Sequence, residues 1–232
     1  MPPLGSATRQ HFSDELARVE EQALGGLDLV AVQLDRTIES IQHQDVELAS
    51  LVVASDDVID GQGGLDRADY RFSPGAVNVN LATGVAQDGW GTVDSLAGIE
   101  WVQGSDFADT LTGGAGNDWL SGMAGNDTLD GGAGTDRADY RNEYDANHDT
   151  YGVVVNLGTA AYVTTAEING KAIGTSVAVN TAIDGWGNVD TLLNMENVRG
   201  TVYKDIIIGS AGNNVIDGQG GNDTIDGGAG FD

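Results

Sequence analysis

The sequence contains no cysteine, few basic residues and no long apolar run, and each shortage excludes a class of protein. Without cysteine, neither a disulfide framework nor a cysteine-ligated metal site can form. The 232 residues carry 10 Lys and Arg against 36 Asp and Glu, and the formal charge of −26 argues against binding to nucleic acid or to an anionic membrane surface. The most apolar run, residues 23–34, is short and contains Asp28, so we expect no membrane span.

Signals for export and catalysis are also missing. The first residues have no basic region followed by an apolar run, so we expect no signal peptide. The sequence has no GxSxG, HExxH or P-loop pattern and no Ser-His-Asp order. His148 has no second histidine nearby, so we expect it in a surface loop, and acids are too abundant for a pair of them to indicate glycoside hydrolysis. We therefore predict no enzymatic activity in this stretch of chain.

Glycine and aspartate are in excess, and they follow a nine-residue repeat. Residues 104–139 read as four consecutive copies: GSDFADTLT, GGAGNDWLS, GMAGNDTLD and GGAGTDRAD. Glycines at positions 1, 2 and 4 permit the positive φ of a tight turn and leave main-chain carbonyls uncrowded. The last three positions are expected to form a short strand that points its central residue inward. The shared residues are the position 6 aspartates Asp109, Asp118, Asp127 and Asp136, and the position 8 apolar residues Leu111, Leu120, Leu129 and Ala138.

Two copies are predicted to make one coil of a parallel β-solenoid, with coils stacked roughly 4.8 Å apart. Asp109 would then lie next to Asp127, and Asp118 next to Asp136. Two such carboxylates repel by roughly 4 kcal/mol at ~4 Å and an effective dielectric constant of 20. A divalent cation between them would remove this repulsion, and Ca²⁺ accepts irregular oxygen cages better than Mg²⁺. The alternative is that the aspartates only cap their turns through side-chain hydrogen bonds.

The chain ends on GTVYKDIII, GSAGNNVID, GQGGNDTID and the partial copy GGAGFD, and because it stops at position 6 we expect it to be a fragment. Asn214 keeps an oxygen but lacks a charge, so we expect a weaker site where it meets Asp232. Asp109 and Asp205 lie in copies without glycine at positions 2 and 4, so for them ligation and turn capping stay equal alternatives. The predicted ligands of several Ca²⁺ ions are Asp66, Asp109, Gly113, Gly114, Gly116, Asp118, Gly122, Gly125, Asp127, Gly131, Gly132, Gly134, Asp136, Asp205, Asn214, Asp223, Gly227, Gly228, Gly230 and Asp232.

Over about residues 61–232 these copies resemble the nonapeptide GGxGxDxUx of the RTX (hemolysin-type) calcium-binding family. The resemblance implies a parallel β-roll, a calcium-binding solenoid with Ca²⁺ held between adjacent turns. It also implies a secreted, extracellular protein whose partners are calcium ions and a type I secretion apparatus. From this resemblance and the charge pattern we predict a chain that folds on binding Ca²⁺ after export.

Two long inserts interrupt the repeats as an internal duplication. GQGGLDRADY at 61–70 reappears as GGAGTDRADY at 131–140, and each copy leads into an insert, 70–103 or 140–199, that contains DGWG. We expect extra coils without calcium turns and a hairpin at Asn169 and Gly170. Trp90 and Trp186 are expected beside turns, with a carbohydrate platform as the alternative. The predicted inward residues are Val77, Val79, Leu81, Leu96, Ile99 and Val102 in the first insert, and Val153, Val155, Leu157, Leu193, Met195 and Val198 in the second.

Residues 1–59 have a different pattern, with apolar residues spaced three and four apart. This spacing predicts an α-helical hairpin, with one helix over about 13–42 and a second, capped by Asp45, that continues to about Ile59. Residues 52–60 also fit a degenerate repeat with Asp57 at position 6, but the unbroken helical spacing favours helix.

Residues 12–59 resemble the N-terminal helices of the phosphate-uptake regulator PhoU family, without that family's acidic metal-cluster motifs. The resemblance implies an alternative function as a cytoplasmic regulator of phosphate transport. The heptapeptide VIDGQGG occurs at 58–64 and again at 215–221, which indicates a junction, natural or an assembly artefact, between the two parts. The predicted fold is therefore mainly β, with a β-roll over 60–232 behind a hairpin over 1–59.

Overall fold

The computed structural model describes residues 58–143, 152–164, 167–168, 171–172 and 176–232, and these residues form strands and turns without any helix. Sheet A has eleven strands, in the order β1 (Val58–Asp60), β5 (Val93–Ala97), β4 (Val85–Gln87), β3 (Asn78–Asn80), β7 (Thr110–Thr112), β9 (Thr128–Asp130), β15 (Val189–Leu193), β14 (Thr181–Ile183), β11 (Val154–Asn156), β17 (Ile206–Ile208) and β19 (Thr224–Asp226). Sheet B has six, in the order β18 (Ile216–Asp217), β16 (Asn197–Arg199), β10 (Arg137–Asp139), β8 (Trp119–Ser121), β6 (Trp101–Gln103) and β2 (Arg67–Asp69). The strands β12 (Glu167–Ile168) and β13 (Lys171–Ala172) pair with each other.

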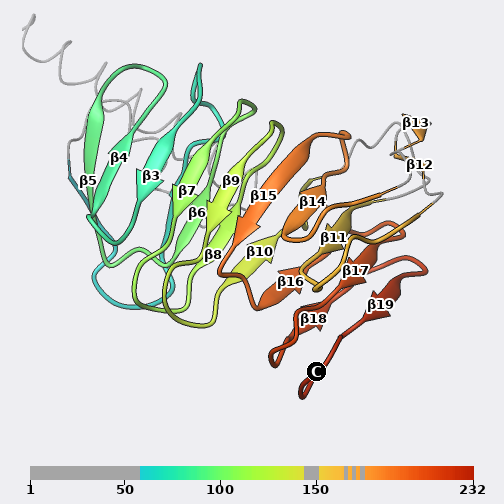
Figure 1. Ribbon diagram of the computed structural model, residues 1–232. Helices are drawn as coiled ribbons and strands as arrows, with labels where there is room; N and C mark the ends of the chain where they lie inside the picture. The colour runs from blue at the N-terminus through green and yellow to red at the C-terminus, as the bar shows by residue number, and fades with distance from the viewer. Residues whose placement is uncertain (1–57, 144–151, 165–166, 169–170, 173–175) are drawn as a thin grey trace, which may run out of the picture. The chain divides into compact units, whose positions relative to one another are not determined.

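The central repeats alternate between the two sheets, as the nine-residue period predicts (Figure 1). Strand β7 pairs with β9 in parallel, with Leu111 opposite Leu129, and β8 pairs with β10, with Leu120 opposite Ala138. All four of these position 8 side chains are fully buried in one core that draws on both sheets. The predicted parallel stacking, with copies one and three on one side and copies two and four on the other, is confirmed.

The inserts do not simply add parallel coils, and this part of the prediction is corrected. Strands β3, β4 and β5 form an antiparallel meander within sheet A, and β11, β14 and β15 are also joined by antiparallel pairs. In the first insert a tight turn allows the reversal, since Gly84 has a φ of 67° and its N–H donates to the Leu81 carbonyl. Each insert then returns to sheet B through β6 or β16, which pair in parallel with their neighbours.

The predicted inward residues of the inserts are buried, apart from Leu81, which is partly buried, and Leu193. Leu193 is 38% exposed, whereas Leu192 is 1% exposed and lies opposite Leu129 of β9. The error arises because two adjacent leucines fit the apolar pattern equally well, and only the alternation of the strand decides which of them faces the core.

The two local predictions outside the repeats have different outcomes. The antiparallel pairing predicted on either side of residues 169–170 is confirmed, because Ile168 lies opposite Lys171. A helix reaching Ile59 is wrong, because Val58–Asp60 is a strand that pairs in parallel with β5, with Ile59 opposite Leu96. Pairing with a distant strand and packing of Ile59 on the core outweigh the local helical spacing. The remaining predictions for residues 1–57, and that for His148, fall outside the described residues.

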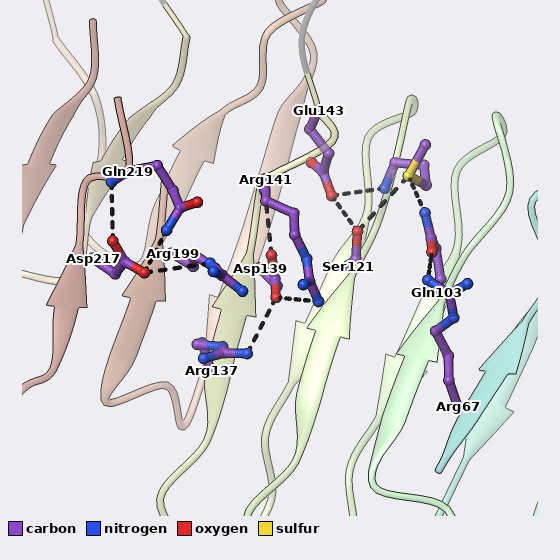
Figure 2. A network of polar contacts seen from close by, with 11 residues as sticks. Arg67, Gln103, Ser121, Arg137, Asp139, Arg141, Glu143, Arg199, Asp217 and Gln219 are labelled. Carbon is purple, nitrogen blue, oxygen red and sulfur yellow. Dashed lines mark hydrogen bonds and ion pairs between the residues drawn. The ribbon is translucent and has the colours of Figure 1, made fainter. Parts of the chain in front are cut away.

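The outer face of sheet B carries arginines that pack against tryptophans. Figure 2 shows four arginines of this face among their polar partners: Arg67, Arg137, Arg141 and Arg199. The guanidinium of Arg67 lies 4.4 Å from the Trp101 ring centroid, Trp101 lies 5.8 Å from Trp119, and Arg137 lies 3.5 Å from Trp119. Arg137 also pairs with the buried Asp139 at 3.3 Å. Because cation–π contacts and ion pairs of this kind need no metal, they stabilise sheet B independently of the acidic turns.

Candidate metal centre

The side chains at position 6, at or close to the start of each parallel strand, line up in two rows. Row A consists of Asp109, Asp127, Asp205 and Asp223, which directly precede strands of sheet A, and of Asp190, the second residue of β15. Row B consists of Asp66, Glu100, Asp118, Asp136, Glu196 and Asn214, which precede the strands of sheet B, and of Asp232, which is joined to Asn214 by a hydrogen bond. The stacking of coils thus gathers acids that are far apart in the sequence along two edges of the fold.

Main-chain N–H groups and carboxylates connect neighbouring members of each row. The Asp109 N–H donates to Asp127 Oδ1 at 2.8 Å, and the Asp118 N–H donates to Asp136 Oδ1 at 2.7 Å. Both predicted neighbour pairs are therefore confirmed. The same bond joins Asp205 to Asp223 at 3.0 Å and Asn214 to Asp232 at 2.9 Å in the C-terminal copies.

Several acids near the middle of the two rows are buried, and burial makes them hard to ionise. Asp118, Asp127 and Asp136 are 3%, 1% and 1% exposed. Burial, reinforced by neighbouring carboxylates, raises the pKa of Asp127 to about 9 and that of Asp136 to about 6. Burial also raises the pKa of Asp205 to about 6 and moves those of Asp109 and Asp118 upward. Ionised rows therefore destabilise the fold until something compensates their charge.

Turn capping accounts for some of these oxygens but not for all. Asp118 Oδ2 accepts the Gly114 N–H at 2.6 Å, and Asp109 Oδ2 accepts the Ser105 N–H at 2.5 Å. Within the described part of the chain, Oδ2 of Asp127 and Oδ2 of Asp136 are buried without any hydrogen-bond partner. The same holds for Asp66 Oδ2 and Asn214 Oδ1. Since buried polar atoms are rarely left unpaired, these oxygens indicate a partner other than the described residues, and a cation would fit them.

Main-chain carbonyls complete an oxygen-rich surrounding at the same places. A side chain on Gly113 would meet the carbonyl oxygen of Gly131 and come within 2.7 Å of Asp118 Oδ2. A Cβ atom on Gly131 would in the same way meet the Asn194 carbonyl oxygen and lie 2.7 Å from Asp136 Oδ2. Glycine is therefore required at position 1, because carboxylate and carbonyl oxygens converge on the space that a side chain would fill.

At most of the other predicted glycines a side chain would also meet the aspartate of its own turn or a carbonyl of the adjacent coil. Cβ atoms there would meet Asp127 Oδ2 at Gly122, Phe107 O at Gly125, Gly114 O at Gly132, Gly116 O at Gly134, Asp232 at Gly227, Ser210 O at Gly228 and Gly212 O at Gly230. A Cβ atom on Gly114 would lie 3.7 Å from Asp118 Oδ2, and one on Gly116 would meet nothing within 4 Å. Among the described residues no three acidic or histidine side chains form a ready-made metal cage. The donor set is two carboxylates with main-chain carbonyls, which suits Ca²⁺.

Four acids of the inserts were missed by the sequence analysis. Asp94 and Asp190 occupy position 6 of GWGTVDSLA and GWGNVDTLL, where tyrosines reach them: Tyr70 OH donates to Asp94 at 3.1 Å and Tyr140 OH to Asp190 at 3.2 Å. Glu100 and Glu196 end shortened turns and directly precede strands β6 and β16, as a position 6 aspartate precedes its strand in a regular repeat. The signal that could have found them is an acid two residues before a buried apolar residue, such as Leu192 or Val198.

The predicted position of the two insert tryptophans beside turns is confirmed. Asp88 Oδ1 accepts the N–H of Trp90 at 3.1 Å, and Asp184 Oδ1 accepts that of Trp186 at 2.9 Å. Each DGWG segment is thus an aspartate-capped turn, which gives both tryptophans a structural setting.

Without Ca²⁺, the protein should gain stability on acidification. The folded-state pKa values of Asp127 (about 9) and Asp136 (about 6) lie above the ordinary 3.8. Their contribution to stability is therefore complete below 3.8 and is lost as the pH rises through about 6 and then about 9. Circular dichroism in chelator should show more strand at about pH 5 than at about pH 9. A strand signal that falls on acidification across this window would contradict the expectation.

Comparison with known families agrees with this geometry. Residues 103–138 and 199–232 match the family model of the RTX calcium-binding nonapeptide repeat (4 copies). These stretches contain the central repeats and the C-terminal copies, and the match does not extend to residues 12–59, where the PhoU-like resemblance lies. No curated protein matches the chain. None of the described residues forms a helix with the length and apolar character that a membrane crossing needs.

Proposed function

We propose that residues 58–232 form a calcium-binding β-roll of a secreted protein, which folds when several Ca²⁺ ions fill the turns of rows A and B. The observation that carries the proposal is the set of buried, unpartnered carboxylate oxygens, above all those of Asp127 and Asp136 among the described residues. Carbonyl oxygens of the adjacent coil lie beside the same turns. The match to the RTX calcium-binding repeat supports Ca²⁺ as the ion.

Ion binding would supply folding free energy. The rows carry acids that resist ionisation in the folded state, so the ion-free chain has a weak tendency to fold at neutral pH. Ca²⁺ compensates these charges and adds its binding free energy to that of folding. Extracellular calcium modules bind at roughly 10⁻⁴ to 10⁻³ M, so such sites are empty in the cytosol and filled outside. The chain would then pass a type I secretion apparatus unfolded and fold on exit, as a binding module without catalytic activity of its own.

The experiment is calorimetric titration of the whole chain with Ca²⁺, compared with Mg²⁺. The native chain should bind several Ca²⁺ ions and respond weakly to Mg²⁺, which demands near-ideal octahedral geometry. The Asp127→Asn variant should bind fewer ions or bind them more weakly. Asp106→Asn is the matched control, because Asp106 is exposed and lies in the turn of the first repeat outside row A. The absence of any heat with Ca²⁺ would overturn the proposal.

A further inference from the structure

We infer that Glu196 is a calcium ligand and that it joins the two blocks of repeats into one continuous row of cation sites. This inference rests on the proposed function. The blocks that match the RTX repeat end at residue 138 and resume at residue 199, and Glu196 lies between them in the sequence, outside both. In row B it is placed between Asp136 of the first block and Asn214 of the second.

Glu196 lies in a turn that is too short for the nine-residue repeat. Strand β15 ends at Leu193 and β16 begins at Asn197, so only residues 194–196 connect the two sheets, whereas residues 131–136 make the same connection from β9 to β10. Asn194 has a φ of 51°, which allows the chain to reverse within this distance. Glu196 is the last residue before its strand, as Asp136 is before β10.

The short turn presents the same oxygen atoms as a regular one. Glu196 Oε2 accepts the Asp136 N–H at 2.9 Å, as Asp136 Oδ1 accepts the Asp118 N–H at 2.7 Å. The Asn194 carbonyl crowds the Cβ position of Gly131, as the Gly131 carbonyl crowds that of Gly113. The three-residue turn 194–196 therefore directs a carboxylate and a carbonyl toward the adjacent coil, as the six-residue turn 131–136 does.

Unpartnered oxygens lie in row B on both sides of Glu196. Asp136 is 1% exposed and its Oδ2 has no hydrogen-bond partner in the described structure. Asn214 is 3% exposed, its Oδ1 is similarly unpartnered among the described residues, and its Nδ2 donates to the Glu196 carbonyl at 2.5 Å. Asp136 Oδ2 lies beside the Cβ position of Gly131, where the carbonyl of Asn194 from the Glu196 turn also converges. A buried acceptor that none of the described donors reaches therefore faces this turn, which favours a cation there.

The first insert repeats the arrangement with Glu100. This residue ends the short turn 98–100 between β5 and β6, and its Oε2 accepts the Asp66 N–H at 3.2 Å. The Gly98 carbonyl crowds the Cβ position of Gly61, and Asp66 Oδ2 is buried without a hydrogen-bond partner in the described part. The duplication has thus placed glutamate at both short turns, so each strand of sheet B is preceded by a row B residue with a side-chain oxygen.

The test is Glu196→Gln in the whole chain, with Ca²⁺ stoichiometry measured by equilibrium dialysis and calorimetry. Glutamine keeps the length and the oxygen that accepts the Asp136 N–H, so a merely structural role would leave Ca²⁺ binding unchanged. We expect the variant to bind about one ion fewer than the native chain, since ligand charge sets affinity in such sites. Asp226→Asn is the control, because Asp226 is exposed on the edge strand β19 and should keep the full stoichiometry.

The possible outcomes distinguish a failure of the proposed function from a failure of the role of Glu196. A native chain that binds no Ca²⁺ would remove the proposed function itself. A native chain that binds Ca²⁺ and a Glu196→Gln variant with the same stoichiometry and affinity would overturn only the role of Glu196. If the variant does not fold, crystals of the native chain grown with Tb³⁺ decide: an anomalous peak between the carboxylates of Asp136 and Glu196 supports the site, and peaks elsewhere with none there overturn it.

Discussion

Removal of Ca²⁺ by excess chelator should abolish most of the strand structure of residues 58–232. The buried acids of rows A and B include Asp127, Asp136 and Asp205, and their raised pKa values make the ionised, ion-free fold unfavourable at neutral pH. A site filled at ten times its Kd adds roughly 1.4 kcal/mol to folding. Four such sites would reach the lower end of the ~5–15 kcal/mol that stabilises a typical domain.

Far-ultraviolet circular dichroism and thermal melting measure this effect. The native chain should show a cooperative melt in millimolar Ca²⁺, a spectrum with little strand in chelator, and recovery when Ca²⁺ is restored. Millimolar Mg²⁺ is the control for general screening of charge, and it should restore much less structure than Ca²⁺. Equal strand content and equal melting temperature in chelator and in Ca²⁺ would contradict the idea that the ions drive folding.

The central repeats were predictable because their period fixes both the strand and its partner. A residue at position 8 recurs every nine residues, so Leu111 and Leu129 must lie opposite each other once two copies make a coil. The same period places Asp109 beside Asp127. The stacking of identical units is the only tertiary information that this prediction needs. For this reason the structure of repeat proteins can be predicted from sequence unusually well.

The inserts were less predictable because their structure depends on turn length and on distant partners. Glu100 and Glu196 are the last residues of three-residue turns, so they break the nine-residue frame that identifies the other acids. Strand β1 has only three residues and is defined by its pairing with β5, more than thirty residues further along the chain. Local spacing contains no information about such a partner, and the helical reading of Ile59 failed for that reason.

Tyrosine gives the fold a second way to satisfy an acid at position 6. Where the chain leaves sheet B for an insert, a regular calcium turn is missing, and Tyr140 OH donates to Asp190 Oδ2 instead. Tyr70 and Asp94 form the same pair in the first copy. Both tyrosines are buried and their pKa values are raised by burial and by the neighbouring acid, so each hydroxyl keeps its proton and remains a donor. In both inserts a buried tyrosine hydroxyl therefore supplies a hydrogen bond to the position 6 acid.

Replacing Gly113 by alanine should cause a large loss of stability and of Ca²⁺ affinity. This substitution tests the contribution of the main-chain oxygens to the site. The new Cβ would lie against the Gly131 carbonyl and 2.7 Å from Asp118 Oδ2, two oxygens of the donor set between Asp118 and Asp136. Overpacking against backbone costs about 1–3 kcal/mol, and separating the two coils would also weaken the cation site between them. We expect a lower melting temperature in Ca²⁺ and a weaker apparent Ca²⁺ affinity.

Gly116→Ala is the matched control, because it changes a glycine of the same repeat to the same residue without a steric conflict. Its Cβ would meet nothing within 4 Å, and Gly116 is not among the glycines with positive φ. Loss of backbone freedom in the unfolded chain makes such a change neutral or slightly stabilising, so this variant should melt and bind Ca²⁺ as the native chain does. If Gly113→Ala and Gly116→Ala behaved alike, the oxygens around Gly113 would have no special role. A loss confined to Gly113→Ala, and larger in Ca²⁺ than in chelator at acidic pH, would instead locate the ion where carbonyl and carboxylate oxygens converge.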